Sequence, residues 1–315
     1  MKHSVELRAL DGRDPLGFLA ALGLLRLLTD EASLDVKLSF NDATAHAILH
    51  GPLASVDDIV EQLVAILESI PADGVLPNAP ATFPEAKAGI GTDPMRSPRG
   101  TYRTAYTALT GDGHQPALDR WLSALVTDLA TDDKGRVAIT PYAAPAGQQS
   151  FRTMFTKPLE HIRPDPRTHF HEALTRWRRV DGYTGEYLDH RAIRTAADHP
   201  TGKSDPAGVP AATWLAIMAL PLLHLTGTGT SPRATCWHHH PTYRQPVMTW
   251  PLWRQPLNTH AAIAILEHPA LRPKPTHHNR DTQPALGIFA TASAIRTRSK
   301  NSAGPLTPLP DVATG

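Results

Sequence analysis

Histidine is unusually abundant in this chain, and one run of three histidines is where metal chemistry could occur. The sequence contains 17 histidines, among them the run His238, His239 and His240 and the later pair His277 and His278. Alternate residues of a strand share a face, so His238 and His240 would point the same way. Imidazole is the commonest metal ligand in proteins. A metal-dependent hydrolase or nuclease using His238, His240, His277 and His278 is therefore one interpretation of the sequence.

The surroundings of these histidines are poor in the acids that such an enzyme needs. No H-E-x-x-H motif accompanies them, and the 115 residues that follow residue 200 contain four carboxylates. Metal-assisted hydrolysis usually requires a general acid or base beside the ion. The metal enzyme is therefore kept as the alternative, and we expect a non-enzymatic protein without a cofactor. The four carboxylates are Asp205, Glu267, Asp281 and Asp311.

A basic stretch that also contains aromatic residues suggests contact with nucleic acid. Residues 151–200 contain nine Lys or Arg and seven carboxylates. Cationic side chains bind phosphates, and guanidinium planes stack on bases. A solvated helix face with internal ion pairs explains the same composition, so both interpretations stay open. The candidate nucleic-acid contacts are Gln148, Gln149, Arg152, Lys157, Arg176, Arg178, Arg179, Arg191 and Arg194.

Several other functional classes are excluded by missing motifs. Gly202-Lys203-Ser204 resembles the end of a P-loop, but Ala197 stands where that motif requires glycine. The chain has no G-x-S-x-G nucleophile elbow. Its single cysteine, Cys236, can form neither an internal disulfide nor a multi-cysteine zinc site.

Two apolar helices are the elements that must organise these residues. Asp14 and Pro15 form an N-cap and first-turn pair, and the apolar run that follows predicts a buried helix over 15–29. A second buried helix is predicted over 211–225, kinked or ended near Pro221. We expect an α+β fold, mainly helical, with small antiparallel sheets and hairpins.

The remaining elements follow from periodicity and capping signals. Alternation predicts a hairpin over 34–50, and Ser55 with Asp58 forms a capping box for a helix ending near Ile70. Further helices are predicted over 116–131, 148–162, 166–180, 258–268 and 286–295, and further strands over 136–142, 233–239 and 247–253.

The order of these elements predicts four parts of the chain. Residues 1–70 form an N-terminal helix–hairpin–helix part, and the proline-rich residues 71–100 form a linker. Residues 101–268 form the main α+β part, and residues 269–315 form a basic, largely flexible tail.

Charge and hydropathy favour a soluble protein with two different faces. The formal net charge is +1, but residues 1–100 have eight cations against 14 carboxylates, and residues 201–315 have ten against four. This gradient suggests an acidic face for one partner and a basic face for another. The first 14 residues are too polar for a secretory signal, and both apolar runs are too short to span a bilayer. We expect a cytoplasmic protein that does not associate with membranes.

Three segments together resemble a known family. The run P-L-G-F-L-A-A-L-G-L-L-R-L-L at Pro15–Leu28 resembles the opening motif of subunits of type I-G (formerly I-U) CRISPR effector complexes. The apolar helix T-W-L-A-I-M-A-L-P-L-L at Thr213–Leu223 and the segment W-P-L-W-R-Q-P-L at Trp250–Leu257 follow in the same order as in that family. Two members fit: the Cascade large subunit, which is generally much longer, and a shorter accessory family regarded as an extension of the CRISPR helicase–nuclease.

The resemblance implies a non-catalytic role in antiviral defence. Such a subunit would bind guide RNA, target DNA and neighbouring effector subunits, while base pairing with the guide reads the sequence. The family motif transfers no catalytic residue to this chain. A protein–protein adaptor without nucleic-acid contact is the remaining alternative.

Overall fold

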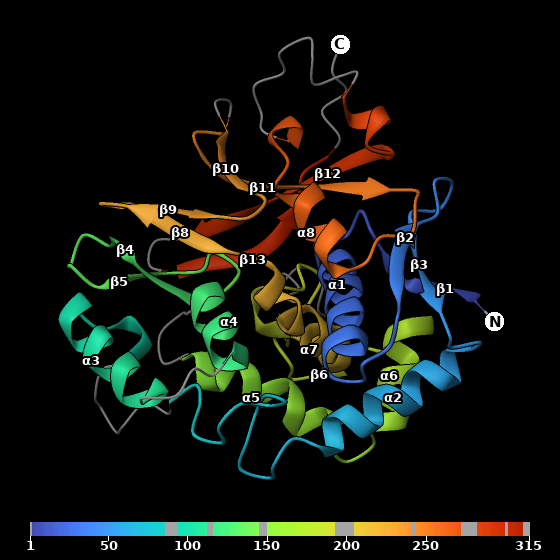
Figure 1. Ribbon diagram of the computed structural model, residues 1–315, viewed down its shortest axis with the longest axis horizontal. Coiled ribbons are helices and arrows are strands. Elements are labelled where there is room, and N and C mark those ends of the chain that lie inside the picture. The colour runs from blue at the N-terminus through green and yellow to red at the C-terminus, as the bar shows by residue number, and fades with distance from the viewer. Residues whose placement is uncertain are drawn as a thin grey trace.

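The helices α1 (Pro15–Asp30) and α7 (Pro210–Met218) lie side by side at the centre of the fold (Figure 1). The computed structural model describes residues 2–85, 94–111, 116–144, 150–192, 205–240, 243–271, 282–299 and 302–310. The α+β class is confirmed. Helices make up 40% of the structure and strands 28%, so the expectation of a mainly helical protein is not confirmed.

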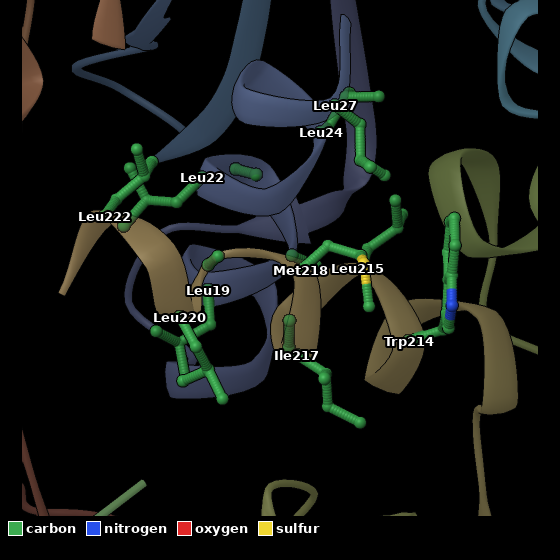
Figure 2. Packing of buried hydrophobic residues seen from close by; sticks show 14 of the residues in the cluster. Leu19, Leu22, Leu24, Leu27, Trp214, Leu215, Ile217, Met218, Leu220 and Leu222 are labelled. Carbon is green, nitrogen blue, oxygen red and sulfur yellow. The ribbon is translucent and has the colours of Figure 1, made fainter. Parts of the chain in front are cut away.

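Helix α1 forms as its capping signals predict. The Asp14 side chain accepts hydrogen bonds from the backbone N–H groups of Leu16 and Gly17, and Pro15 occupies the first turn. Every residue from Pro15 to Leu28 is buried. Leucine side chains of α1 and the side chains of α7 form one continuous cluster (Figure 2). The two apolar helices are thus the centre of the core, as the sequence predicts. The second helix is shorter than the predicted 211–225, because it ends at Met218 and Leu220–Leu222 form a 3-10 turn at Pro221.

An antiparallel sheet in the order β1-β3-β2 flanks the start of α1. Its strands are β1 (His3–Asp11), β2 (Lys37–Phe40) and β3 (His46–Gly51). The expected hairpin is confirmed by the pairing of β2 with β3. Strand β1 was not predicted, although Val5 and Leu7 alternate with polar neighbours along it.

A second antiparallel sheet, in the order β10-β11-β12-β13, lies above the central helices in Figure 1, next to the β1-β3-β2 sheet. Trp250 and Trp253 of β11 donate indole N–H bonds to the carbonyl oxygens of Gly12 (2.7 Å) and Leu38 (2.8 Å). The sheet is thereby fastened to the N-terminal part of the chain. Its strands are β10 (Trp237–His240), β11 (Gln245–Trp253), β12 (Ile288–Ser299) and β13 (Ser302–Pro308).

Strands β12 and β13 correct two expectations. The expected helix over 286–295 is wrong, because Ile288–Ser299 is a strand, and the tail beyond residue 269 is not largely flexible where β12 and β13 pair. Along β12, Ala292, Ala294 and Arg296 are buried and alternate with less buried neighbours. The alanines mask this period-two pattern in the sequence, because alanine is the strongest helix former and is depleted in strands.

Helices surround the remaining faces of the core. The capping box predicted at Ser55 is present, and the Asn258 side chain caps the helix expected over 258–268. The expected helix over 116–131 is wrong in its second half, because the chain becomes a strand at Val126, and β-branched Val126, Thr127 and Thr131 suit a strand. The helices are α2 (Val56–Glu68), α3 (Arg99–Thr110), α4 (Pro116–Leu125), α5 (Phe151–Ile162), α6 (Pro166–Thr175) and α8 (Thr259–Leu266).

Three small two-stranded sheets complete the described structure. The pair β4–β5 and the pair β8–β9 touch through a bridge between Ala130 and Gly229. The strands are β4 (Val126–Thr131), β5 (Val137–Ile139), β6 (Val180–Asp181), β7 (Ala207–Gly208), β8 (Leu225–Thr228) and β9 (Ser231–Ala234). The 3-10 turns are η1 (Pro94–Arg96), η2 (Gly185–Tyr187), η4 (Leu220–Leu222) and η5 (Pro269–Leu271).

One hydrophobic cluster extends from Val5 to Leu306 and includes residues of the helices and of both larger sheets. The proline-rich residues 71–85 contribute Val75, Leu76 and Phe83 to it. The four predicted parts of the chain therefore share a core where the structure describes them. Within the described residues, no helix combines the length and the apolar character needed to cross a bilayer.

Candidate nucleic-acid interface

The histidines of the metal hypothesis lie on β10, where the structure places His238 and His240 two residues apart. The Nε2 atom of His238 lies 3.2 Å from the Oγ1 atom of Thr249, and burial lowers the pKa of His238 to about 4. The His240 ring lies 4.9 Å from that of Tyr243. No group of three or more His, Cys, Asp or Glu side chains suited to a metal is found among the described residues. The predicted ligands His277 and His278 lie outside those residues.

Two of the predicted phosphate contacts are ion-paired at the end of α6. Arg179 donates to the buried carboxylate of Asp189 at 2.7 Å and to the carbonyl of Ala207 at 2.7 Å. Arg178 pairs with Glu172 at 2.7 Å, on the surface. Asp189 is 1% exposed, so Arg179 is the partner that its buried charge requires.

The other predicted contacts are divided among several places. Arg152 donates to the carbonyl oxygens of Ala81 and Asp73 and so fastens the proline-rich segment. Lys157 pairs with Glu160 at 2.9 Å. Gln148, Gln149 and Arg194 lie outside the described residues.

Arg176 and Arg191 are both exposed, and neither forms a close ion pair with a described residue. Arg191 is exposed, with Nη2 3.6 Å from the carboxylate of Asp14. Arg176 is exposed, and its side chain has no hydrogen bond or ion pair with any described residue. The structure thus brings some predicted contacts near the end of α6, but most of them bind carboxylates or carbonyl groups of the same chain.

Cations that the sequence analysis did not select gather at the other end of the molecule, around the β4–β5 hairpin. Its turn forms because Asp132 Oδ1 accepts the backbone N–H groups of Lys134 and Arg136, both at 2.9 Å, and Gly135 supplies a positive φ of 71°. Asp132 Oδ2 also accepts Arg136 Nε at 2.7 Å. Partial burial acts to raise the Asp132 pKa, but these hydrogen bonds outweigh it and hold the pKa below its usual value.

The start of α3 brings further arginines to this hairpin. Pro98 forms a bridge with Arg136, and Val137 N–H donates to Ser97 O at 3.0 Å. Arg99 and Arg103 are one turn apart on α3, so they share a helix face. Arg103 Nε lies 2.6 Å from Asp128 of β4.

We call the set Arg96, Arg99, Arg103, Lys134 and Arg136 the basic surface. Arg103 and Arg136 are neutralised by the carboxylates of Asp128 and Asp132. No described side chain pairs with Arg96, Arg99 or Lys134. Figure 1 shows α3, β4 and β5 together at one end of the fold, opposite the β1-β3-β2 sheet.

A pocket of about 280 Å³ lies beside the basic surface. It is open between β5 and the β8–β9 hairpin, and Thr131 N–H donates to Gly229 O at 2.8 Å where the two hairpins meet. Its lining combines charged, hydroxyl and apolar groups. The lining residues are Arg96, Thr131, Asp132, Arg136, Val137, Ala138, Ile139, Thr230 and Pro232.

Sequence reasoning missed the basic surface because its members come from two separated segments. Residues 96–103 and 134–136 become neighbours only in the fold, through the Pro98–Arg136 bridge and the adjoining hydrogen bond from Val137 to Ser97. The available signal was the i,i+4 spacing of Arg99 and Arg103.

Comparison of the chain with models of known protein families gives no match, and none of the curated proteins matches it. The site is therefore interpreted from its own residues.

Proposed function

We propose that this chain is a non-catalytic subunit of a type I CRISPR effector complex, which binds guide RNA or target DNA through the basic surface. The observation that carries the proposal is a surface that presents Arg96, Arg99 and Lys134 without a described carboxylate partner. Cations of this kind release counterions when they meet phosphates.

The resemblance to CRISPR effector subunits supplies the biological setting of the proposal. The segments that carry it, Pro15–Leu28, Thr213–Leu223 and Trp250–Leu257, come together in the core. Phe18 stacks on Trp250 with ring centroids 5.5 Å apart, and Arg26 Nε donates to the carbonyl of Met218. Contact among the three segments supports their treatment as one motif. The proposed partners are other effector subunits, and the proposed location is the cytoplasm.

Binding of the purified chain to labelled single-stranded RNA and DNA tests the interface. The double variant Arg99→Ala/Lys134→Ala removes two cations of the basic surface that have no partner among the described residues. Arg8→Ala/Lys37→Ala removes one Arg and one Lys from β1 and β2, where neither side chain pairs with a described residue. We expect the first variant to bind weakly and the second to bind as the natural chain does. Equal binding by both variants would show that the interface lies elsewhere on the chain.

Purification from native extract tests the CRISPR assignment separately. We expect the tagged chain to bring down repeat-derived RNA together with further effector subunits. A chain that brings down partner proteins and no RNA would instead support the adaptor alternative.

A further inference from the structure

The pocket beside the basic surface has a volume suited to a single base. Ligand pockets for small molecules usually begin at about 300 Å³, and this one measures about 280 Å³. A volume of this size admits a single ring system, and a base that is stacked in a duplex cannot enter it. Single-stranded nucleic acid can turn a base outward into a protein pocket.

The lining matches the two kinds of surface that a base presents. Ile139 and Pro232 are the more exposed apolar residues of the lining and offer surface to the flat faces of a ring, whereas Val137 and Ala138 are buried. Hydroxyl groups are placed at the rim by Thr131, which is half-buried, and Thr230, which is exposed. A hydroxyl both donates and accepts hydrogen bonds, so it can satisfy the polar edge of a base.

The charges of the pocket place a phosphate at one side of it. Arg96 is half-buried and has no described carboxylate partner, so its guanidinium is the free cation of the lining. Arg136 is already held by Asp132, with Nη2 2.6 Å from Oδ2. Asp132 and Arg136 neutralise each other, so their side of the pocket suits an uncharged ring rather than an anion. A neutral ring in the pocket with its phosphate on Arg96 therefore fits better than a free phosphate.

We propose that this pocket holds one unstacked base of a single-stranded nucleic acid, with Thr131 and Thr230 at the base edge and Arg96 on the adjoining phosphate. The inference rests on the proposed function, because it assigns one contact within the same interface. It also predicts that single strands bind more tightly than a duplex of equal charge.

Oligonucleotides that differ only in their bases test the inference. The probes are an oligo-dC strand and a strand with the same number of phosphates made entirely of abasic sites. We expect the abasic strand to bind at least about fivefold more weakly to the natural chain, as expected for the loss of one stacked base. The ratio of the two dissociation constants is the measured quantity.

Charge-neutral variants show whether this ratio comes from the pocket. Thr131→Val/Thr230→Val removes the rim hydroxyls and keeps shape and charge. Thr226→Val/Thr228→Val makes the same change on exposed positions of β8 that do not line the pocket. We expect the first variant to lower the ratio severalfold and the second to leave it unchanged. Melting curves of the natural chain and both variants confirm that the fold is retained.

The possible failures are distinguishable. If neither strand binds at any concentration reached, both the inference and the proposed function are wrong. If both strands bind equally, or if the pocket variant keeps the full ratio, the base pocket is wrong and the phosphate-binding surface stands.

Discussion

The backbones of Gly23 and Leu215 touch: a Cβ atom on Gly23 would lie 1.7 Å from the carbonyl oxygen of Leu215. The contact sets the distance between α1 and α7, and only glycine permits it. Two of the three segments on which the proposed CRISPR role rests are thus joined at a position where any side chain would separate them.

Gly23→Ala tests the closeness of this contact. The added methyl group meets backbone rather than a movable side chain, so we expect a loss of about 3 kcal/mol or more in the free energy of unfolding. The matched control is Gly100→Ala in α3, where a Cβ meets nothing within 4 Å. Alanine there should be neutral or stabilising by up to about 1 kcal/mol. Urea titration measures both, and equal stabilities for the two variants would contradict the contact.

Leu22→Asp tests whether α1 is the centre of the core. Leu22 is fully buried, and an unpaired carboxylate there costs several kcal/mol, a large share of a typical stability of about 5–15 kcal/mol. We expect an unfolded or insoluble chain. Leu129→Asp makes the same change on a side chain that is 55% exposed and should leave the melting temperature nearly unchanged. A soluble Leu22→Asp protein with an unchanged melting temperature would show that α1 is not core.

Neighbouring arginines at the end of α6 should behave differently. Arg179→Ala leaves the buried Asp189 carboxylate unpaired, so we expect a loss of about 3–5 kcal/mol of stability. Arg178 is 53% exposed where it pairs with Glu172, and Arg178→Ala should cost about 0–1 kcal/mol. Thermal unfolding measures both. Equal losses would mean that the Asp189 pair does not stabilise the fold.

Acid should destabilise the protein through His238. Burial lowers its pKa from 6.5 to about 4, so the folded state favours the neutral imidazole. The unfolded chain takes up the proton first as the pH falls, and the His238 contribution to stability is therefore present above pH 6.5 and is lost between pH 6.5 and 4. We expect His238→Gln to flatten this part of the stability profile. The exposed neighbour His239 is the control, and an identical profile for His239→Gln and His238→Gln would contradict the assignment.

The core could be predicted from the sequence because its signals are local. Asp14 and Pro15 mark the start of α1, and its apolar run has no polar stripe, which requires burial on all sides. Arg26 interrupts that run. Its bond to Glu31 is local, but its bond to the Met218 carbonyl crosses to α7, and no pattern around Arg26 shows that contact. Strand β12 was missed because its pairing with β11 depends on residues about 40 positions earlier in the chain.

The candidate site was less predictable than the core. Clustering along the sequence drew attention to residues 176–194, but Arg179 and Asp189 are ten positions apart and form an internal pair. The cations near Arg99 and Lys134 are separated by more than 30 residues and meet through the isolated bridge between Pro98 and Arg136. Density of charge along a chain does not show which charges are already neutralised.

The salt dependence of strand binding tests the central claim most directly. The logarithm of the association constant should fall linearly with the logarithm of salt concentration, with about 0.7 units of slope for each phosphate contacted on a single strand. We predict that Arg99→Ala/Lys134→Ala reduces this slope by about one to two units, whereas Arg8→Ala/Lys37→Ala leaves it unchanged. An unchanged slope in the first variant, or an equal reduction in both, would contradict phosphate binding by the basic surface.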